Sequence, residues 1–483
     1  MKIWAMDIEA LDGAGDPETL RFSSGDYTQV EAGPAHRFYE PRLIQPSMFT
    51  VAAITGPLLP SMGDNGLGEA VLVNADGGLD YLADYALDGR SMTLRVIDDG
   101  SAITAINGTV LKMVFSGSRV TVQLRDPLAE LDKTIPANRF AGDNSLPNGV
   151  EGTSQDIGGT RKPLVFGSVV NATPVMVNTS KLIYQVHDGS DVTITEVRDR
   201  GVVLTFESTA SDLTDLLTTA PAAGKWRRFE GYFSLGSAGQ LITCDAERDS
   251  VGAGDVFEEL ADLMGFTVAS ADVTALNAVG DVGFYLAEDR PARDALSAIA
   301  HGCGAYWAHN GTDIRVLSLA APGTVDITIE DWQILELNRK ATGSGPDGLP
   351  VPKITLRADR IETVQNDVAS SVANPARYAS EYRETTSSDS AVATRHPLAT
   401  ELAIDGLLRD LGDAGSVAST LLPLLKVRRD ITESIVQLDD LSVLFVGATV
   451  SLETERLGYP RSFVLLGWTV NARRNRVTLY LWG

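Results

Sequence analysis

A chain of 483 residues is too long for a single hydrophobic core, and its 44% hydrophobic and 22% charged residues argue against disorder over most of its length. The formal net charge of −24 disfavours sequence-specific nucleic-acid binding, because both partners would be anionic. No apolar run approaches the ~20 residues of a membrane helix, and acidic residues interrupt the start where a signal peptide would be apolar. We therefore expect a protein made in the cytoplasm without stable membrane insertion.

The first 138 residues are predicted to form a β-rich domain. Residues 118–125, SRVTVQLR, alternate apolar and polar side chains, which predicts a half-buried strand with Val120, Val122 and Leu124 in the core. Residues 74–90, NADGGLDYLADYALDGR, carry apolar residues at helical spacing after a Gly-Gly break, which predicts a short helix. Residues 139–162 follow as a connection, since they are rich in Gly, Asn, Ser and Pro and lack periodicity.

Residues 163–250 are predicted to form a second β-domain. The stretch 184–206, YQVHDGSDVTITEVRDRGVVLTF, alternates strand-like runs with HDGS and RDRG, where the chain must reverse. The pair His187-Asp188 could instead be part of a catalytic site. Because Asp-Gly is typical of turns, we prefer the interpretation that this pair belongs to a turn.

Residues 251–320 are predicted to form a small α+β domain. In residues 255–266, DVFEELADLMGF, Asp255 is placed to cap a helix and Glu258 to complete a capping box. The predicted buried face of this helix comprises Phe257, Leu260, Leu263 and Met264. A second helix is expected from Asp289 to Gly302, with Pro291 in its first turn, followed by a hairpin around Asn-Gly at 310–311.

Residues 321–483 are predicted to form a C-terminal β-rich domain with a helical insertion. It contains a linker at 338–352, a strand at 353–364, a loop at 370–397, helices at 399–411 and 417–425, and a hairpin at 468–482. The predicted fold class is therefore a mainly β, multidomain protein with a small α+β insertion domain.

Motifs for catalysis are missing or incomplete. Ser237 lies in LGSAG, where Leu235 replaces the first glycine of GxSxG, and GAGDVF at 252–257 lacks the third glycine of a dinucleotide turn. His301 and Cys303 are two residues apart at a helix end, but a frayed-end histidine beside a buried cysteine is our preferred interpretation. Both Cys244 and Cys303 are expected to be small core residues. We predict no enzyme and no catalytic, cofactor-binding or metal-ligating residues.

Several stretches in one order resemble the tail-tip or baseplate hub proteins of long-tailed bacteriophages and related gene transfer particles. They are NADGGLDYLADYALDGR, SGSRVTVQLRDPLAELD, RKPLVFGSVVNATPVMVNTSKLIYQVHDG, DVFEELADLMGF, DVGFYLAEDRPARDALSAIAHGCGAYWAHNGTDIRVLSL and LGWTVNARRNRVTLYLWG. Together they cover most of the chain loosely, and none is a catalytic signature.

The resemblance implies tail-hub-like β-domains and a structural role in the virion tail tip, assembled in the host cytoplasm. Hubs of this family usually form trimers that adapt a sixfold tail tube to a threefold tip, so the resemblance implies a homotrimer. It further implies a distal tail ring protein, a tape-measure protein and a central tip or receptor-binding protein as partners, and a place in the DNA ejection channel. An acidic lumen would repel passing DNA.

Two alternatives stay open at this point. One is a tail-associated cell-wall hydrolase, since carboxylate pairs such as Asp439-Asp440 are plentiful. The other is a module that binds host-surface glycans, with Trp226, Tyr232, Tyr306 and Trp307 as stacking platforms. For the hub itself, the predicted subunit contacts are three aromatics of the terminal hairpin, which could equally lie in that hairpin's own core: Trp468, Tyr480 and Trp482.

Overall fold

The structure, a computed structural model, describes residues 2–30, 36–53, 56–59, 66–98, 101–145, 147–310, 313–341, 349–438 and 440–483. Strands account for 44% of it and helices for 17%, so the predicted mainly β class is confirmed. The chain divides into two units built from segments far apart in sequence. The first comprises Met1–Glu130, Trp307–Pro350 and Val427–Gly483, and the second comprises Leu131–Tyr306 and Val351–Lys426. The partition into five consecutive domains stays a prediction.

A seven-stranded antiparallel sheet forms one half of the first unit. Its order is β2 (Pro17–Ser23), β1 (Ile3–Leu11), β9 (Ser91–Asp98), β10 (Ser101–Ser116), β11 (Arg119–Arg125), β8 (Glu69–Val73) and β5 (Leu43–Gln45). Strand β11 buries Val120, Val122 and Leu124, as its alternation predicted. The short helix expected in residues 74–90 is a 3₁₀ helix, η1 (Asp80–Asp84), rather than an α-helix. Strands β3 (Tyr27–Gln29) and β4 (Arg37–Tyr39) pair separately, and η2 (Pro127–Asp132) follows β11.

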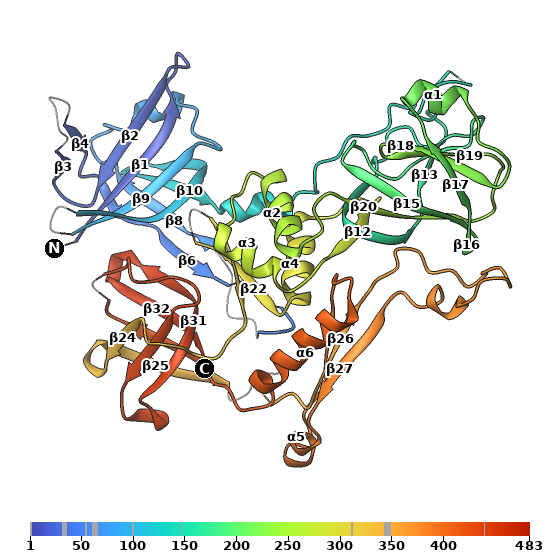
Figure 1. Cartoon of the computed structure of the whole chain (residues 1–483). Coiled ribbons are helices and arrows are strands. Elements are labelled where there is room, and N and C mark those ends of the chain that lie inside the picture. Colours follow the sequence, from blue (N-terminus) through green and yellow to red (C-terminus); the bar gives the residue numbers. More distant parts are fainter. Residues whose placement is uncertain are drawn as a thin grey trace. The chain divides into compact units, whose positions relative to one another are not determined.

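The second sheet of this unit draws its strands from both ends of the chain (Figure 1). Its order is β24 (Ile327–Glu330), β30 (Thr449–Glu453), β31 (Arg461–Asn471), β32 (Arg476–Trp482), β29 (Ile431–Val436) and β25 (Ile334–Ala341), while β6 (Met48–Ala52) pairs with β31 and with β7 (Gly66–Leu67). Strands β24 and β25 are the two ends of this order, yet only η3 (Asp331–Gln333) joins them. Because three residues span at most about 10 Å, the sheet must curl until these edges approach each other.

The C-terminal hairpin is confirmed. Strands β31 and β32 pair around η6 (Ala472–Arg474), after which Asn475 adopts the left-handed conformation that lets the chain reverse. A second short helix, η5 (Arg456–Gly458), precedes β31. The linker predicted at 338–352 is wrong at its start, because β25 continues to Ala341; residues 342–348 lie outside the described part of the chain.

Two five-stranded sheets form a sandwich in the second unit (Figure 1). One has the order β16 (Val202–Val203), β15 (Val192–Asp199), β20 (Ile242–Arg248), β12 (Leu164–Ala172) and β21 (Gly283–Leu286). The other has β13 (Val175–Asn178), β14 (Ile183–Gln185), β19 (Tyr232–Leu235), β18 (Lys225–Phe229) and β17 (Thr205–Thr209), with α1 (Leu213–Thr218) beside them. Val165, Ile194 and Ala246 of the first sheet share a core with Trp226 and Phe233 of the second.

One sequence prediction for this region is confirmed, because residues 184–206 follow the strand, turn, strand order. The described residues between 139 and 162 contain isolated bridges and no named strand or helix, and their role as a connection between domains stays a prediction.

The rest of the second unit combines helices with a small sheet. The helices are α2 (Ala253–Leu263), α3 (Ser270–Asn277), α4 (Ala292–Gly302), α5 (Ser390–Arg395), α6 (Leu411–Leu425) and the short η4 (Pro375–Arg377). The sheet has the order β27 (Arg383–Ser388), β26 (Lys353–Ala358) and β28 (Leu402–Asp405). Within the described residues no helix is long and apolar enough to cross a membrane.

The predicted cap of α2 is wrong. The helix begins two residues before Asp255, with Gly252 at the capping position and no side-chain cap of its own. Instead Asn277, at the end of α3, accepts hydrogen bonds from the backbone N–H groups of Gly254 and Asp255 through Oδ1, at 2.8 and 3.0 Å. The free N–H groups of the first turn are thus satisfied from a neighbouring helix.

The predicted buried face of α2 is half right. Phe257 and Leu260 are buried, but Leu263 is exposed and Met264 is only partly covered, since the helix ends there and Gly265 turns the chain away. Helix α4 begins three residues after Asp289 and ends at Gly302 as predicted.

The region before α6 also differs from prediction. The helix predicted at 399–411 is wrong except for Leu411, the first residue of α6, because β28 pairs in parallel with β26 and buries Leu402 and Ile404 by alternation. The loop predicted at 370–397 contains β27 and α5. Helix α6 covers the helix predicted at 417–425 but begins earlier, where Asp410 accepts hydrogen bonds from the N–H groups of Gly412 and Asp413. The expected hairpin of β22 (Ala305–His309) and β23 (Ile314–Ser318) is present, with Gly311 outside the described residues.

Candidate functional site

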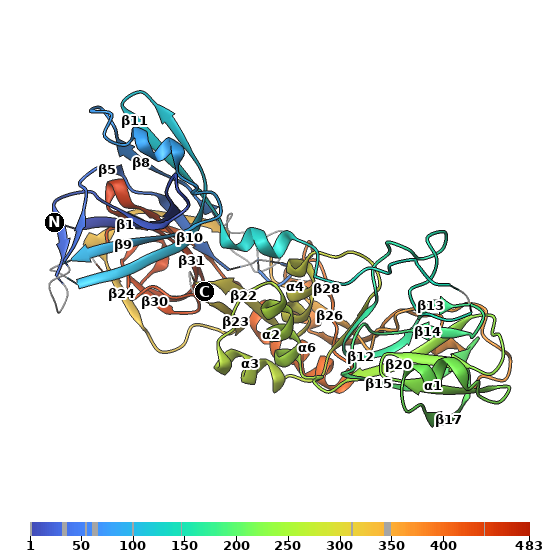
Figure 2. The ribbon, with the colours of Figure 1, turned by 90° about the horizontal axis from the view of Figure 1, so that it is seen from above.

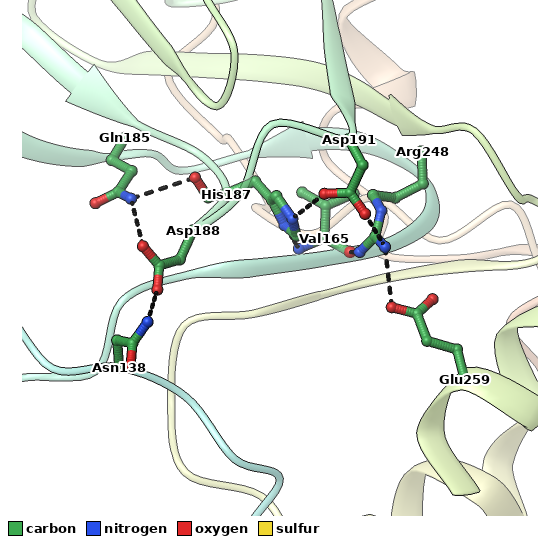
Figure 3. A network of polar contacts seen from close by, with 8 residues as sticks. All are labelled: Asn138, Val165, Gln185, His187, Asp188, Asp191, Arg248 and Glu259. Atoms are coloured by element: carbon green, nitrogen blue, oxygen red, sulfur yellow. Dashed lines mark hydrogen bonds and ion pairs between the residues drawn. The ribbon is translucent and has the colours of Figure 1, made fainter. Parts of the chain in front are cut away.

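His187 is the residue that most invites a catalytic interpretation, and the structure places it in the loop between β14 and β15 with a side chain that is almost fully buried. Its Nδ1 accepts a hydrogen bond from the backbone N–H of Val165 at 3.0 Å (Figure 3). Because an accepting Nδ1 leaves the proton of a neutral ring on Nε2, that atom donates to Asp191 Oδ1 at 3.2 Å. Both ring nitrogens are therefore occupied by structural hydrogen bonds.

A chain of ion pairs continues from this histidine. The carboxylate of Asp191 pairs with Arg248, which lies at the end of β20 (Figure 3). Arg248 donates to the carbonyl oxygen of Val165 at 3.0 Å and to Glu259 Oε1, on α2, at 3.0 Å. The network thus holds both backbone groups of Val165 and ties β12, β20, α2 and the loop after β14 together.

The electrostatics of the network keep the ring neutral. Burial, reinforced by the charge of Arg248, lowers the pKa of His187. Burial opposes ionisation of Asp191, but Arg248, a backbone hydrogen bond and His187 together outweigh it, so the pKa of that carboxyl is lowered. Burial raises the pKa of Glu259, against the pull of Arg248. An uncharged histidine between a backbone donor and a carboxylate is an arrangement that fixes a loop.

Asp188 does not face the histidine that precedes it. Its carboxylate accepts hydrogen bonds from Asn138 Nδ2 at 2.8 Å and from Gln185 Nε2 at 3.3 Å, on the other side of the loop (Figure 3). The two neighbours in sequence therefore belong to different sets of contacts and do not form a dyad. The turn interpretation of His187-Asp188 is confirmed.

The cysteines and the helix-end histidine are also placed in the core. Cys244 and Cys303 are both buried, and His301 is buried at the end of α4. Burial raises the pKa of both thiols, that of Cys303 to about 12, so neither is an activated nucleophile. Among the residues that the structure describes, no cluster of three or more His, Cys, Asp or Glu side chains could hold a metal ion.

The aromatics of the terminal hairpin are less accessible than a contact surface requires. Trp482 is fully buried and Trp468 is 7% exposed, so both lie in the core, which was the alternative to a subunit contact. Tyr480 is half-buried and its hydroxyl shares a hydrogen bond with Thr469 at 3.0 Å. The role of these three aromatic residues as subunit contacts stays a prediction. Of the three, Tyr480 has the more exposed side chain.

The side chains considered as glycan platforms are mostly internal. Trp226, Tyr306 and Trp307 are buried, and Tyr232 is partly covered in the second sheet of the sandwich. Indole Nε1 of Trp226 donates to the carbonyl oxygen of Leu204 at 3.2 Å, as expected of a core tryptophan. These rings do not form an exposed stacking surface.

Sequence reasoning missed a buried carboxylate in the second unit. Asp359 follows β26 and is surrounded by Arg377, Arg383 and Arg409. The distances from its carboxylate to Arg377 Nη2 and Arg409 Nη2 are both 2.9 Å. The arginines come from segments up to 50 residues away, so no local sequence motif predicts the cluster.

Two exposed apolar surfaces in the first unit were missed as well. The first, here called the β10 edge, is residues 111–116, where Leu111 is 50% and Val114 and Phe115 are each 40% exposed. The second, here called the Trp332 patch, lies at η3: Trp332 is 73% exposed, and the exposed Asp331, Leu335 and Glu336 are its neighbours in sequence. The runs LKMVF and EDWQILE were their only signal in the sequence.

Comparisons with known proteins return structures but no family: no family model and no curated protein matches. A 43 kDa tail protein of prophage MuSo2 from Shewanella oneidensis is 9% identical with a TM-score of 0.42, over 100% of this chain and 98% of that one. A tail protein from Neisseria meningitidis MC58 is 10% identical with a TM-score of 0.40, over 95% and 96%. The p2 virion baseplate in its activated conformation is 8% identical with a TM-score of 0.27, over 99% and 98%. The structures similar to this chain are thus phage tail and baseplate proteins.

Proposed function

We propose that this chain is a structural component of a phage tail tip or baseplate: a hub that joins the end of the tail tube to the central tip and forms part of the DNA ejection channel. The observation that supports it best is a combination of two features: the buried polar networks hold the fold together, and apolar side chains are exposed at the surface. The His187 network and the Asp359 cluster bind elements together, while the β10 edge and the Trp332 patch present apolar side chains outward. Apolar surface of this kind marks an interaction site.

The proposed partners follow from the sequence resemblance to tail hubs. They are two further copies of the chain in a homotrimer, a distal tail ring protein, a tape-measure protein and a central tip or receptor-binding protein. The proposed location is the virion tail tip, after assembly in the host cytoplasm. The net charge of −24 suits a channel wall, because a negative surface repels DNA that passes along it.

Native mass measurement and imaging of the purified chain test the proposal. A trimer that encloses a central channel is the expected result, and it should bind the distal tail ring protein of the same particle. A chain that remains monomeric at micromolar concentrations and does not bind this ring protein would refute the hub proposal.

The absence of enzyme activity is part of the same proposal. Purified cell walls incubated with the chain should keep their turbidity, because the histidine that most resembles a catalytic residue is committed to structural hydrogen bonds. Clearing of the walls, abolished by substitution of a carboxylate pair, would favour the hydrolase instead.

A further inference from the structure

The β10 edge is an unpaired strand. Strand β9 pairs with β10 only as far as Thr109, and Val110 exchanges two backbone hydrogen bonds with the loop before β9. A bulge follows at Leu111, after which β11 pairs with residues 112–116 from the other side. In the part of the chain that the structure describes, no strand lies along the outer side of those residues. Their outward N–H and C=O groups are free to pair with another chain.

Apolar side chains flank this edge on both faces. The register pairs Phe115 with Val120, and Val114 with Thr121, so Phe115 and Val114 point to opposite faces of the hairpin. Both are 40% exposed. An added strand would therefore gain backbone hydrogen bonds and cover apolar surface above and below it.

The charge of the hairpin indicates the kind of partner. Residues 101–125 contain Lys112, Arg119 and Arg125 and no Asp or Glu, so their formal charge is +3. The chain as a whole carries −24, which leaves −27 on the remainder. A basic, apolar strand in so acidic a protein fits an acidic and apolar surface.

The Trp332 patch has that chemistry. It lies between β24 and β25, on the second sheet of the same unit, and combines Trp332 and Leu335 with the carboxylates of Asp331 and Glu336. Figure 2 shows strand β24 and the β11 end of the hairpin at different sides of this unit. A tryptophan rimmed by charged residues is typical of the centre of a protein interface.

We infer that the β10 edge of one copy docks on the Trp332 patch of a second copy. Pairing of two β10 edges with each other would gather the positive charges of two hairpins in one sheet, which is less favourable than contact with an acidic patch. Contact between two different surfaces is heterologous, and heterologous contacts close into rings when the rotation between copies permits. The inference rests on the proposed self-assembly and names the surfaces that produce it.

Charge reversal tests this contact on the full chain. One variant carries Lys112→Glu and Arg119→Glu, and another carries Asp331→Lys and Glu336→Lys; all four positions are exposed. Sedimentation over a range of concentrations should show assembly weakened about tenfold in each variant. A chain that carries all four substitutions should restore it to within about threefold, because edge and patch are then both reversed and are complementary again. Arg473→Glu with Arg474→Glu, at the exposed turn of η6, is the matched control and should leave assembly unchanged.

Cross-linking tests the same contact without changing any charge. The two native cysteines are buried, so Val114→Cys in one preparation and Leu335→Cys in another supply the accessible thiols. A short bismaleimide should join the mixed preparations and neither one alone. Assembly that both charge variants leave intact would overturn the inference and leave the hub proposal standing. A wild-type chain that does not associate at all would count against both.

Discussion

His187→Phe tests whether the buried histidine network is structural. The phenyl ring retains the shape of a planar side chain but offers no acceptor to the N–H of Val165 and no donor to Asp191. A buried donor left without a partner costs about 1–3 kcal/mol, and the lost hydrogen bond to the half-exposed carboxylate of Asp191 adds about 1 kcal/mol. We expect the free energy of unfolding to fall by about 2–4 kcal/mol.

His187→Asn is the matched control. Its side-chain oxygen lies two bonds from Cβ, as Nδ1 of histidine does, so it can still accept from Val165. Urea denaturation should therefore place Asn between the wild type and Phe. Amide hydrogen exchange of peptides that contain Val165 should show faster exchange in His187→Phe than in His187→Asn. Equal denaturation midpoints for all three proteins, with unchanged protection of the Val165 amide, would show that the network does not hold the loop.

The variant His187→Phe also tests how much His187 contributes to the pH dependence of stability. Since burial and Arg248 lower the pKa of His187, protonation favours the unfolded chain, where the pKa is about 6.5. The stability that the neutral ring contributes is fully present above that value and is lost as the pH falls through it towards the folded pKa. Wild-type stability should thus drop more between pH 7.5 and 5.5 than that of His187→Phe. Parallel pH profiles would contradict the lowered pKa.

The other buried features make similar predictions. Asp359→Asn keeps a residue that tolerates φ +49° but removes the charge facing three arginines, so urea denaturation should show a loss of about 3 kcal/mol. Asp367→Asn, at an 81% exposed ion pair, should cost less than about 0.5 kcal/mol; similar losses would refute the distinction. Gly167→Ala puts a Cβ 1.9 Å from the carbonyl oxygen of Val282 and should prevent soluble folding, whereas Gly224→Ala, with positive φ but open space, should cost about 1–2 kcal/mol in thermal unfolding. Both cysteine thiols should react with Ellman's reagent only in denaturant; rapid native reaction would contradict their burial.

Elements whose pattern is local were predictable from the sequence. The alternation of β11 and the terminal hairpin is complete within a few residues, and an alternating segment has only one face to bury. The turn at His187-Asp188 was predictable for the same reason, since Asp-Gly favours reversal whatever surrounds it. The mainly β class follows from the sum of such segments.

Tertiary partners decided the rest. Residues 402–405 form a strand because β26 offers a parallel neighbour, although their surroundings are rich in helix-forming residues. Asn277 satisfies the first turn of α2 in place of the predicted cap. The exposure of Trp468 and Trp482 could not be judged from the hairpin alone, because the opposite face of a strand is covered or free according to strands far away in the chain.

The functional surfaces show the same division. The sequence by itself determined that the chain is acidic, rich in strands and poor in catalytic motifs, since these are properties of composition and spacing. Only the tertiary structure decided that β9 leaves β10 after Thr109 and that η3 carries Trp332 outward. Strand edges and exposed faces exist only once the sheets are ordered, because a residue becomes accessible through the neighbours that it lacks.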